Sequence, residues 1–271
     1  MRKTDTHKKD LKDLLTDFLS TWDDIPITQY FIQNSNLPGR RGNLEMASAF
    51  VNIIEEEFTD HLDGIWNLSV GLTKMSSTEA PTNDPREMIP FCGTRALGSI
   101  GAISDDYFKK SIIILRELAS DPRWRMREAV AAALGRILLQ RGQLLIHELE
   151  HWINNSNWLE MRAVAAAVAH PSALGNNNIP QLALNLHKSI FQRINETRKR
   201  KSEKFKVLRK GLCYTLSVVT QAIPEEGFSY MKHLIGVNDP DINFIVRENL
   251  KKNRLKKNFP NEIASLNEIL K

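Results

Sequence analysis

Two histidines separated by one helical turn are the first candidates for chemistry in this sequence. His147 and His151 belong to the stretch HELEH, and Glu148 follows the first of them. On a helix this spacing places both imidazoles on one face, which is the pattern of zinc-dependent hydrolases. Such enzymes need a third ligand, and the nearest later histidine, His170, precedes Pro171 in an expected turn. A metal-dependent hydrolase is therefore the third hypothesis for function, and we expect no metal and no cofactor.

Lysine and arginine gather in two segments of the last third of the chain. Nine basic residues and two glutamates lie between Arg193 and Lys210, and six basic residues and one glutamate lie between Arg247 and Lys257. The whole chain has a formal net charge of +5, so the remainder is net negative. Segments of this kind either bind polyanions in a salt-dependent way or form solvated helix faces. The polyanion-binding candidates are Arg198, Lys199, Arg200, Lys201, Lys204, Arg247, Lys251, Lys252 and Arg254.

Tryptophan and arginine stand together near two expected helix starts. Trp124 is followed by Arg125 and Arg127, and Trp158 is followed by Arg162. Packing between helices is the ordinary role of such tryptophans. The alternative is an aromatic and basic groove able to hold a peptide or an extruded base. These five residues are the predicted partner-binding residues.

The sequence around the two tryptophans repeats at a spacing of 34 residues, and this repeat predicts the elements that position them. DPRWRMREAVAAALG begins at Asp121 and NNSNWLEMRAVAAAVAH begins at Asn154, so that Trp124 falls on Trp158. A period of this size corresponds to two helices and two turns, which is the unit of an α-solenoid. We therefore expect an all-α fold, specifically a right-handed α-solenoid, or α-α superhelix.

The first copy resembles the consensus of HEAT repeats, in which an Asp-Pro turn precedes an apolar-Arg pair and an alanine-rich helix that ends in Leu-Gly. Partial echoes occur at residues 94–98 and 239–250. The resemblance covers residues 90–255 and implies a stack of HEAT-like helical repeats, a fold that serves many partners. The matching residues are Asp121, Pro122, Met126, Arg127, Leu134 and Gly135.

Among proteins with HEAT-like repeats, the chain is distantly similar to the alkylpurine DNA glycosylases. The stretch WRMR at residues 124–127 resembles the arginine-bearing helix start of that family. The preceding stretch CGTRALG at residues 92–98 lacks the aromatics and the aspartate that the family places on its active-site helix. A catalyst that stabilises a cationic base needs a negative charge at its site. The resemblance therefore implies nucleic-acid binding more than catalysis.

Helical periodicity extends over most of the chain, and no run alternates with the period of a strand. We expect separate helices at residues 124–140 and 143–154, and a basic connector before a helix at residues 208–221. The whole chain is predicted to form one elongated domain, residues 1–271. It comprises atypical N-terminal helices at 1–73, a proline-containing loop at 74–90, HEAT-like repeats at 91–255 and a C-terminal cap at 256–271.

Composition narrows the class of protein. Apolar residues make up 42% and charged residues 25% of the chain, as in ordinary soluble proteins. Cys92 and Cys213 are far apart, so we expect buried thiols and neither a disulfide framework nor a zinc site. No window holds the roughly 20 uninterrupted apolar residues of a membrane span, and the N-terminus is charged. We expect a cytoplasmic protein with no membrane partner.

The leading hypothesis is a non-enzymatic scaffold that binds a macromolecular partner, a protein, on the concave face of the solenoid. The second hypothesis is a DNA- or RNA-binding protein related to the HEAT-like glycosylases, which would use the basic C-terminal third. Electrostatics separates the two, because contacts to phosphates weaken steeply as salt is added.

Overall fold

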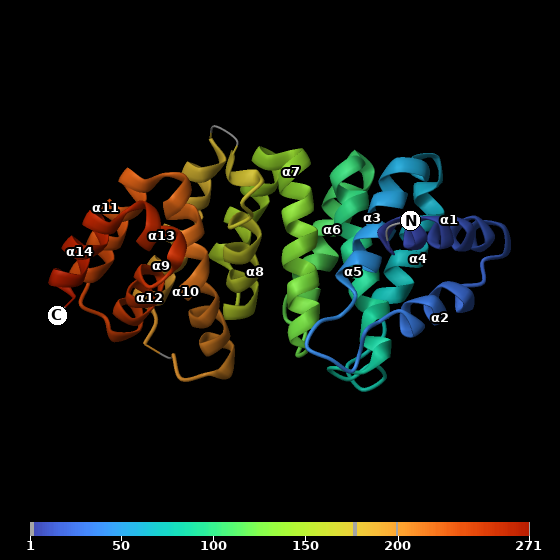
Figure 1. The fold of residues 1–271 in the computed structure, drawn as a ribbon, viewed down its shortest axis with the longest axis horizontal. Helices are drawn as coiled ribbons and strands as arrows, with labels where there is room; N and C mark the ends of the chain where they lie inside the picture. The colour runs from blue at the N-terminus through green and yellow to red at the C-terminus, as the bar shows by residue number, and fades with distance from the viewer. Residues whose placement is uncertain (1–2, 176–177, 199, 271) are drawn as a thin grey trace. The chain divides into compact units, whose positions relative to one another are not determined.

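The computed structural model describes residues 3–175, 178–198 and 200–270, and every regular element in these ranges is a helix. The all-α prediction is therefore confirmed. Lys199, one of the polyanion-binding candidates, lies outside the described residues. The chain divides into two compact units, Met1–Gln140 (unit 1) and Arg141–Lys271 (unit 2), and the colours of Figure 1 follow the chain from one unit into the other. The single elongated domain stays a prediction.

In unit 1, helix α5 is the centre of the core. Its residues are buried along almost the whole helix, and it packs against α3, α4 and α6. Small residues also allow α5 to approach the first part of α7 closely: a Cβ atom added at Gly98 would lie 2.4 Å from Cα of Ala133. The helices of unit 1 are α1 (Lys3–Thr21), α2 (Ile25–Gln33), α3 (Leu44–Glu57), α4 (Leu62–Thr73), α5 (Met88–Ile103), α6 (Asp105–Leu118) and the first part of α7 (Trp124–Asn154).

The two helices that the sequence predicts at residues 124–140 and 143–154 are confirmed as two helical segments of α7 that meet at a kink. The backbone leaves helical geometry at Arg141, where φ is −129° and ψ is 36°, and unit 2 begins at the same residue. By length and composition α7 is the one described helix that could cross a bilayer, but half of its most apolar window is buried inside the protein. Core helices of this kind pass the same test.

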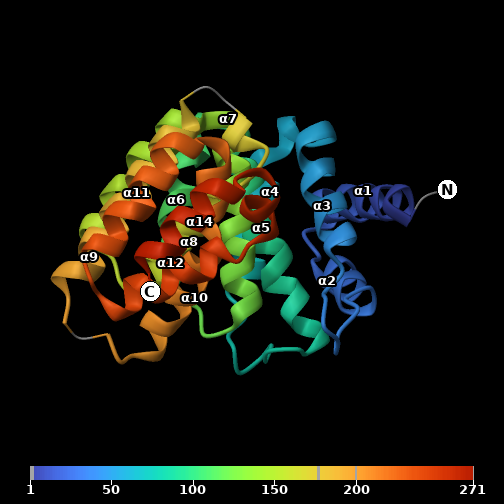
Figure 2. The same ribbon diagram turned by 60° about the vertical axis from the view of Figure 1, so that its left-hand side comes forward.

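In unit 2, helix α10 is the central element. It packs against α8, α9, α11, α12 and α13, and the two views in Figures 1 and 2 show α12 beside it. It begins earlier than the sequence predicts, because the Ser202 side chain caps it by accepting a hydrogen bond from the Phe205 amide. The remaining helices are α8 (Trp158–Val168), α9 (Ile179–Glu196), α10 (Glu203–Ala222), α11 (Pro224–Gly236), α12 (Pro240–Leu250), α13 (Asn253–Asn258) and α14 (Pro260–Ile269).

The sequence repeat corresponds to a repeat in local structure. Trp124 and Trp158 are each the first residue of a helix. Asn157 caps α8 with its side chain, and the Asp121 carboxylate accepts from the Arg123 amide before α7. The repeated apolar positions are buried in both copies, so the residues that repeat are core residues. They are Ala129, Val130, Ala133 and Leu134 in unit 1, and Ala163, Val164, Ala167 and Val168 in unit 2.

Both cysteines are buried free thiols, as the sequence predicts. Burial raises the pKa of Cys92 to about 12 and, as the largest of several causes, that of Cys213 to about 11. A thiol with so high a pKa is not a nucleophile at neutral pH.

Candidate functional site

A hollow of about 580 Å³ lies in unit 2, where the segment between α9 and α10 meets the start of α12. Five of its seven lining residues are basic and one is acidic, so it is strongly positive. We call it the basic hollow; its lining residues are Arg198, Arg200, Lys201, Phe205, Lys206, Arg209 and Asp241.

Two of these arginines are anchored to carboxylates at the start of α12. Nη1 of Arg200 lies 2.6 Å from Oδ2 of Asp239 and 3.6 Å from Oδ2 of Asp241, and Nη1 of Arg209 lies 2.5 Å from Oδ1 of Asp241. Asp239 also caps α12 by accepting from the amides of Asp241 and Ile242. Burial opposes ionisation of Asp239, but these hydrogen bonds outweigh it and hold the pKa of the carboxyl below its usual value. The anchored arginines therefore give the hollow a defined shape.

Two other cations of the basic hollow face solvent. Arg198 and Lys201 are exposed, and within the described part of the chain neither makes an ion pair or a side-chain hydrogen bond. Lys206 is paired with Glu203 at 2.6 Å on the open surface, where such pairs contribute little. Arg198 and Lys201 are therefore the groups best able to bind an external anion.

Two exposed aromatic rings of unit 2, one on α12 and one on α10, each lie against an arginine. The Phe244 ring is 42% exposed, and Cζ of Arg209 lies 4.9 Å from its centroid. The Tyr214 ring is 49% exposed, and Cζ of Arg254 lies 4.5 Å from its centroid. Because Arg209 also lines the basic hollow, its pair with Phe244 adjoins the hollow, and Tyr214 with Arg254 adds a second cation–ring pair in unit 2. We call the whole the basic–aromatic surface.

The remaining basic candidates have mixed positions in unit 2. Lys204 and Lys251 are exposed, although Lys251 pairs with Glu248 at 2.5 Å, and Lys252 is half-buried. Nη2 of Arg247 donates to the Leu270 carbonyl at 3.0 Å. Arg247 therefore serves the C-terminal end of the fold more than an external ligand.

Two predicted groove residues support the basic hollow from α8. The Trp158 ring packs edge-on against Phe205, with 5.3 Å between centroids, and Phe205 lines the hollow. A Cβ atom added at Gly211 of α10 would lie 3.3 Å from Cγ of Arg162. Trp158 is half-buried, so it acts as backing for the hollow and not as the wall of a separate groove.

The other predicted groove residues belong to unit 1, and Arg125 differs from the prediction. Trp124 is 45% exposed, but Arg125 beside it is only 4% exposed. Its guanidinium lies 3.0 Å from Oε2 of Glu87 and donates to the Gly39 carbonyl at 2.7 Å. Arg127 donates to backbone carbonyls of its own turn, at residues 121 and 122. Arg125 is therefore not accessible to a partner, because its charge is neutralised inside unit 1.

Arg123 is a residue that sequence reasoning missed. It is 3% exposed, pairs with Asp121 at 2.7 Å, and donates to the carbonyls of Met75, Ser76 and Ala80. Together with Arg125 it fixes the predicted loop 74–90 at several points, although many of the loop's side chains remain exposed. The sequence around Arg123 does not indicate the carbonyl groups that accept its hydrogen bonds, because they lie more than 40 residues earlier in the chain.

A second charged cluster of unit 1 is also self-contained. Glu55 of α3 accepts from Arg136 of α7 at 2.8 Å and from the Ser99 hydroxyl of α5. Arg95 of α5 lies near this cluster, and burial lowers its pKa. The Glu55 carboxylate of α3 therefore does reach α5, although residues 92–98 contain no acid. It is already bound by Arg136 and Ser99 within unit 1.

His147 and His151 face one another on the surface of α7. Their Nε2 atoms are 3.3 Å apart, and both side chains are exposed. Within the described ranges, no group of three or more His, Cys, Asp or Glu residues could hold a metal ion. Among the described residues, His147 and His151 therefore lack the third ligand that a zinc-dependent hydrolase requires.

Comparisons with known proteins add little to this geometry. No family model matches the chain, and no curated protein matches it. Among solved structures, the crystal structure of an engineered protein is similar at 14% sequence identity and a TM-score of 0.38, over 94% of this chain and 97% of that one. So low a TM-score carries no argument about fold or function.

Proposed function

We propose that this protein binds nucleic acid through the basic–aromatic surface of unit 2 and does no chemistry on it. The observation that carries the proposal is that Arg198 and Lys201 are exposed and, among the described residues, without an ion-pair partner, in a unit that also exposes the rings of Phe244 and Tyr214. Cations neutralise phosphates and release counterions, whereas exposed rings stack on bases. A surface that merely maintained solubility would have no need of exposed rings.

The fold that we propose for this function is a HEAT-like α-solenoid. Support comes from the matched helix starts and matched buried positions of the 34-residue repeat. The Asp-Pro turn at Asp239 adds to it, because Asp239 both caps α12 and pairs with Arg200. In repeat proteins, a helical framework that recurs along the chain leaves the exposed side chains available to bind partners.

Fluorescence anisotropy with labelled single-stranded DNA and RNA, at two salt concentrations, tests the proposal. We expect binding at low salt that weakens steeply as salt rises. The double variant Arg198→Glu and Lys201→Glu should lose at least tenfold in affinity, because two attractive contacts become repulsive. Lys109→Glu is the matched control: it reverses one exposed lysine on α6 of unit 1 and should leave the affinity within twofold. Absence of binding at low salt would refute the proposal.

A protein partner is the second candidate, and exposed apolar side chains of unit 1 favour it. Trp22 is 61% exposed, Ile25 57% and Trp124 45%, and exposed tryptophan is typical of binding hot spots. A photo-crosslinking amino acid at position 124 should then capture one defined protein in cells, whereas the same group at position 109 should not. Equal labelling from both positions would argue against this candidate.

A further inference from the structure

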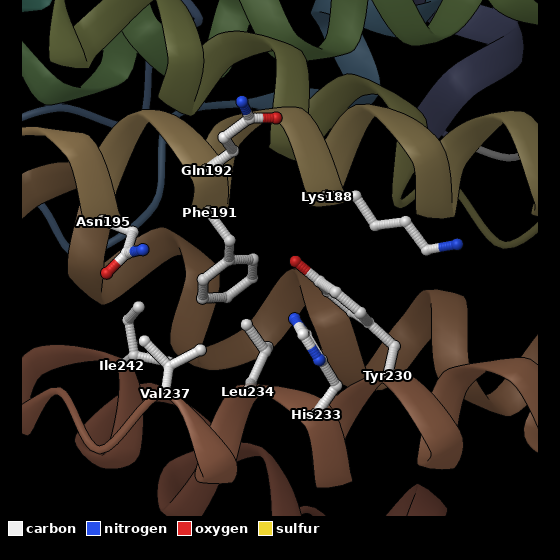
Figure 3. A pocket seen from close by; sticks show the side chains of 9 residues that line it. All are labelled: Lys188, Phe191, Gln192, Asn195, Tyr230, His233, Leu234, Val237 and Ile242. Carbon is white, nitrogen blue, oxygen red and sulfur yellow. The ribbon is translucent and has the colours of Figure 1, made fainter.

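A second pocket of unit 2 lies between α9 and α11 and has a volume of about 370 Å³. This is within the range of roughly 300–1,000 Å³ typical of small-ligand sites. Figure 3 shows the α9 residues on one side and the α11 residues on the other, with the Tyr230 hydroxyl directed across toward α9. The lining residues are Lys188, Phe191, Gln192, Asn195, Tyr230, His233, Leu234, Val237 and Ile242.

The floor of this pocket is apolar and its walls are aromatic. Phe191, Leu234 and Ile242 are buried and form the floor. The Tyr230 and His233 rings are nearly parallel, at 20° with 6.0 Å between centroids, and Phe191 meets Tyr230 edge-on. A flat, unsaturated ring is the ligand shape that such walls accommodate best.

The polar groups of the pocket are arranged around its rim, and none of the lining residues is acidic. Nζ of Lys188 lies 5.7 Å from the Tyr230 centroid. Burial raises the pKa of Tyr230, so that its hydroxyl remains a neutral donor at physiological pH. Within the described part of the chain the Asn195 amide makes no hydrogen bond, whereas Gln192 donates to Glu196 at 2.9 Å. An amide, a hydroxyl and an ammonium group suit the polar edge of a base and an adjoining phosphate.

The pocket and the basic hollow are lined by residues that are close in the sequence at two places. Asp241 lines the hollow, and the next residue, Ile242, lines the pocket. On α9 and the segment after it, Asn195 of the pocket precedes Arg198 of the hollow by three residues. We therefore expect a strand whose phosphates contact Arg198 to reach the pocket as well.

We propose that the pocket between α9 and α11 receives one unstacked nucleobase of a single strand whose phosphates lie on the basic hollow. The inference rests on the proposed function and makes it specific, because a base inside a duplex cannot enter such a pocket without being extruded. The protein should therefore prefer single strands to duplexes and base-bearing strands to abasic ones.

The test compares a base-bearing single strand with an abasic strand of the same length and charge. The wild type should bind the base-bearing strand about tenfold more tightly, as expected for one stacked base. Tyr230→Ala and His233→Ala should remove this preference and leave the affinity for the abasic strand unchanged. Lys232→Ala, an exposed neighbour on α11 that does not line the pocket, should keep the preference. Because His233 is exposed, its variant should fold even if Tyr230→Ala does not.

The outcomes separate the two proposals. If the wild type binds both strands and neither pocket variant changes the ratio, the pocket proposal fails while the proposed function stands. If the wild type binds neither strand at low salt, both fail. A short acidic, aromatic peptide is the comparison probe: should the variants weaken its binding and not that of the strand, the pocket serves a protein and our proposal is overturned.

Discussion

Two arginines of unit 1 and two cations of unit 2 lie in opposite environments. Arg123 and Arg125 are almost fully buried, and their guanidinium groups bind carboxylates and backbone carbonyls of the 39–87 region. Arg198 and Lys201 are exposed and, in the described residues, without carboxylate partners. Similar cations thus fasten a loop in one unit and present charge to solvent in the other.

Solvation explains why the buried and the exposed cations should affect stability and binding differently. A buried guanidinium has lost its water, so its partners must replace every interaction, and removing one partner leaves an uncompensated charge. An exposed cation keeps its water and contributes almost nothing to the free energy of unfolding, which leaves it available to a ligand. Arg123 and Arg125 should therefore matter for stability, and Arg198 and Lys201 for binding.

The largest expected effect comes from the same substitution made in both units. Arg125→Ala should lower the free energy of unfolding by about 3–5 kcal/mol, because it leaves the fully buried Glu87 without its cation. Arg198→Ala should change it by less than about 0.5 kcal/mol. Urea denaturation measures both. Adding Glu87→Gln to Arg125→Ala should recover part of the loss; no recovery would mean that packing, not charge, explains it.

A buried histidine in the core of unit 2 should make the free energy of unfolding depend on pH. His187 is fully buried, with Nδ1 2.9 Å from the Ala183 carbonyl and Nε2 3.0 Å from the Thr215 hydroxyl. Burial lowers its pKa from 6.5 to about 4, although the bond to Ala183 opposes this. Between pH 6.5 and pH 4 the His187 imidazole is protonated in the unfolded chain and neutral in the folded chain. Its contribution to stability is thus complete above pH 6.5 and falls as pH decreases, by about 3 kcal/mol at pH 4.

Denaturation midpoints from pH 7 to pH 4 measure this loss, and His187→Gln is the control. The variant has no titrating ring at this position, so its profile should be flatter over the same interval. A variant profile as steep as that of the wild type would assign the acid sensitivity to other groups.

The smallest effect concerns the exposed rings beside arginines, which occur in both units. Tyr214→Ala should weaken nucleic-acid binding about tenfold, since a ring stacked on a base contributes roughly 1–3 kcal/mol. Tyr214→Phe should retain most of the affinity. Trp124→Ala removes an equally exposed ring, over which Arg125 lies at 4.4 Å, and should leave the affinity unchanged. A loss at Trp124 as large as that at Tyr214 would contradict the assignment of binding to unit 2.

Local patterns predicted the helices well and their limits less well. Apolar periodicity and capping residues such as Asn157 and Asp239 act within a few residues, so they can be read directly from the chain. The two helices predicted at residues 124–140 and 143–154 match the two segments of α7 on either side of the non-helical residue Arg141. The start of α10 was predicted too late, because the capping residue Ser202 stands within a run of basic residues that predicts a connector.

The candidate site was predictable in composition but not in geometry. The basic run at residues 198–204 predicted polyanion-binding candidates, of which Arg198 and Lys201 are exposed in the structure, and their binding role stays a prediction. The pocket between α9 and α11 gave no signal, because its walls come from residues about 40 positions apart that have ordinary core and surface types. Arg125 was assigned to a groove because burial of a charged residue is rare and depends on partners that sequence spacing does not show.

By itself, the sequence determined the helical class, the repeated core positions and the concentration of positive charge in the last third of the chain. These properties follow from interactions within one or two helical turns or from simple counting. Only the tertiary structure decided which cations are neutralised and which face solvent. That decision depends on acceptors far away in the sequence, such as Glu87 and Gly39 for Arg125, because burial and pairing belong to the packed chain and not to any single segment.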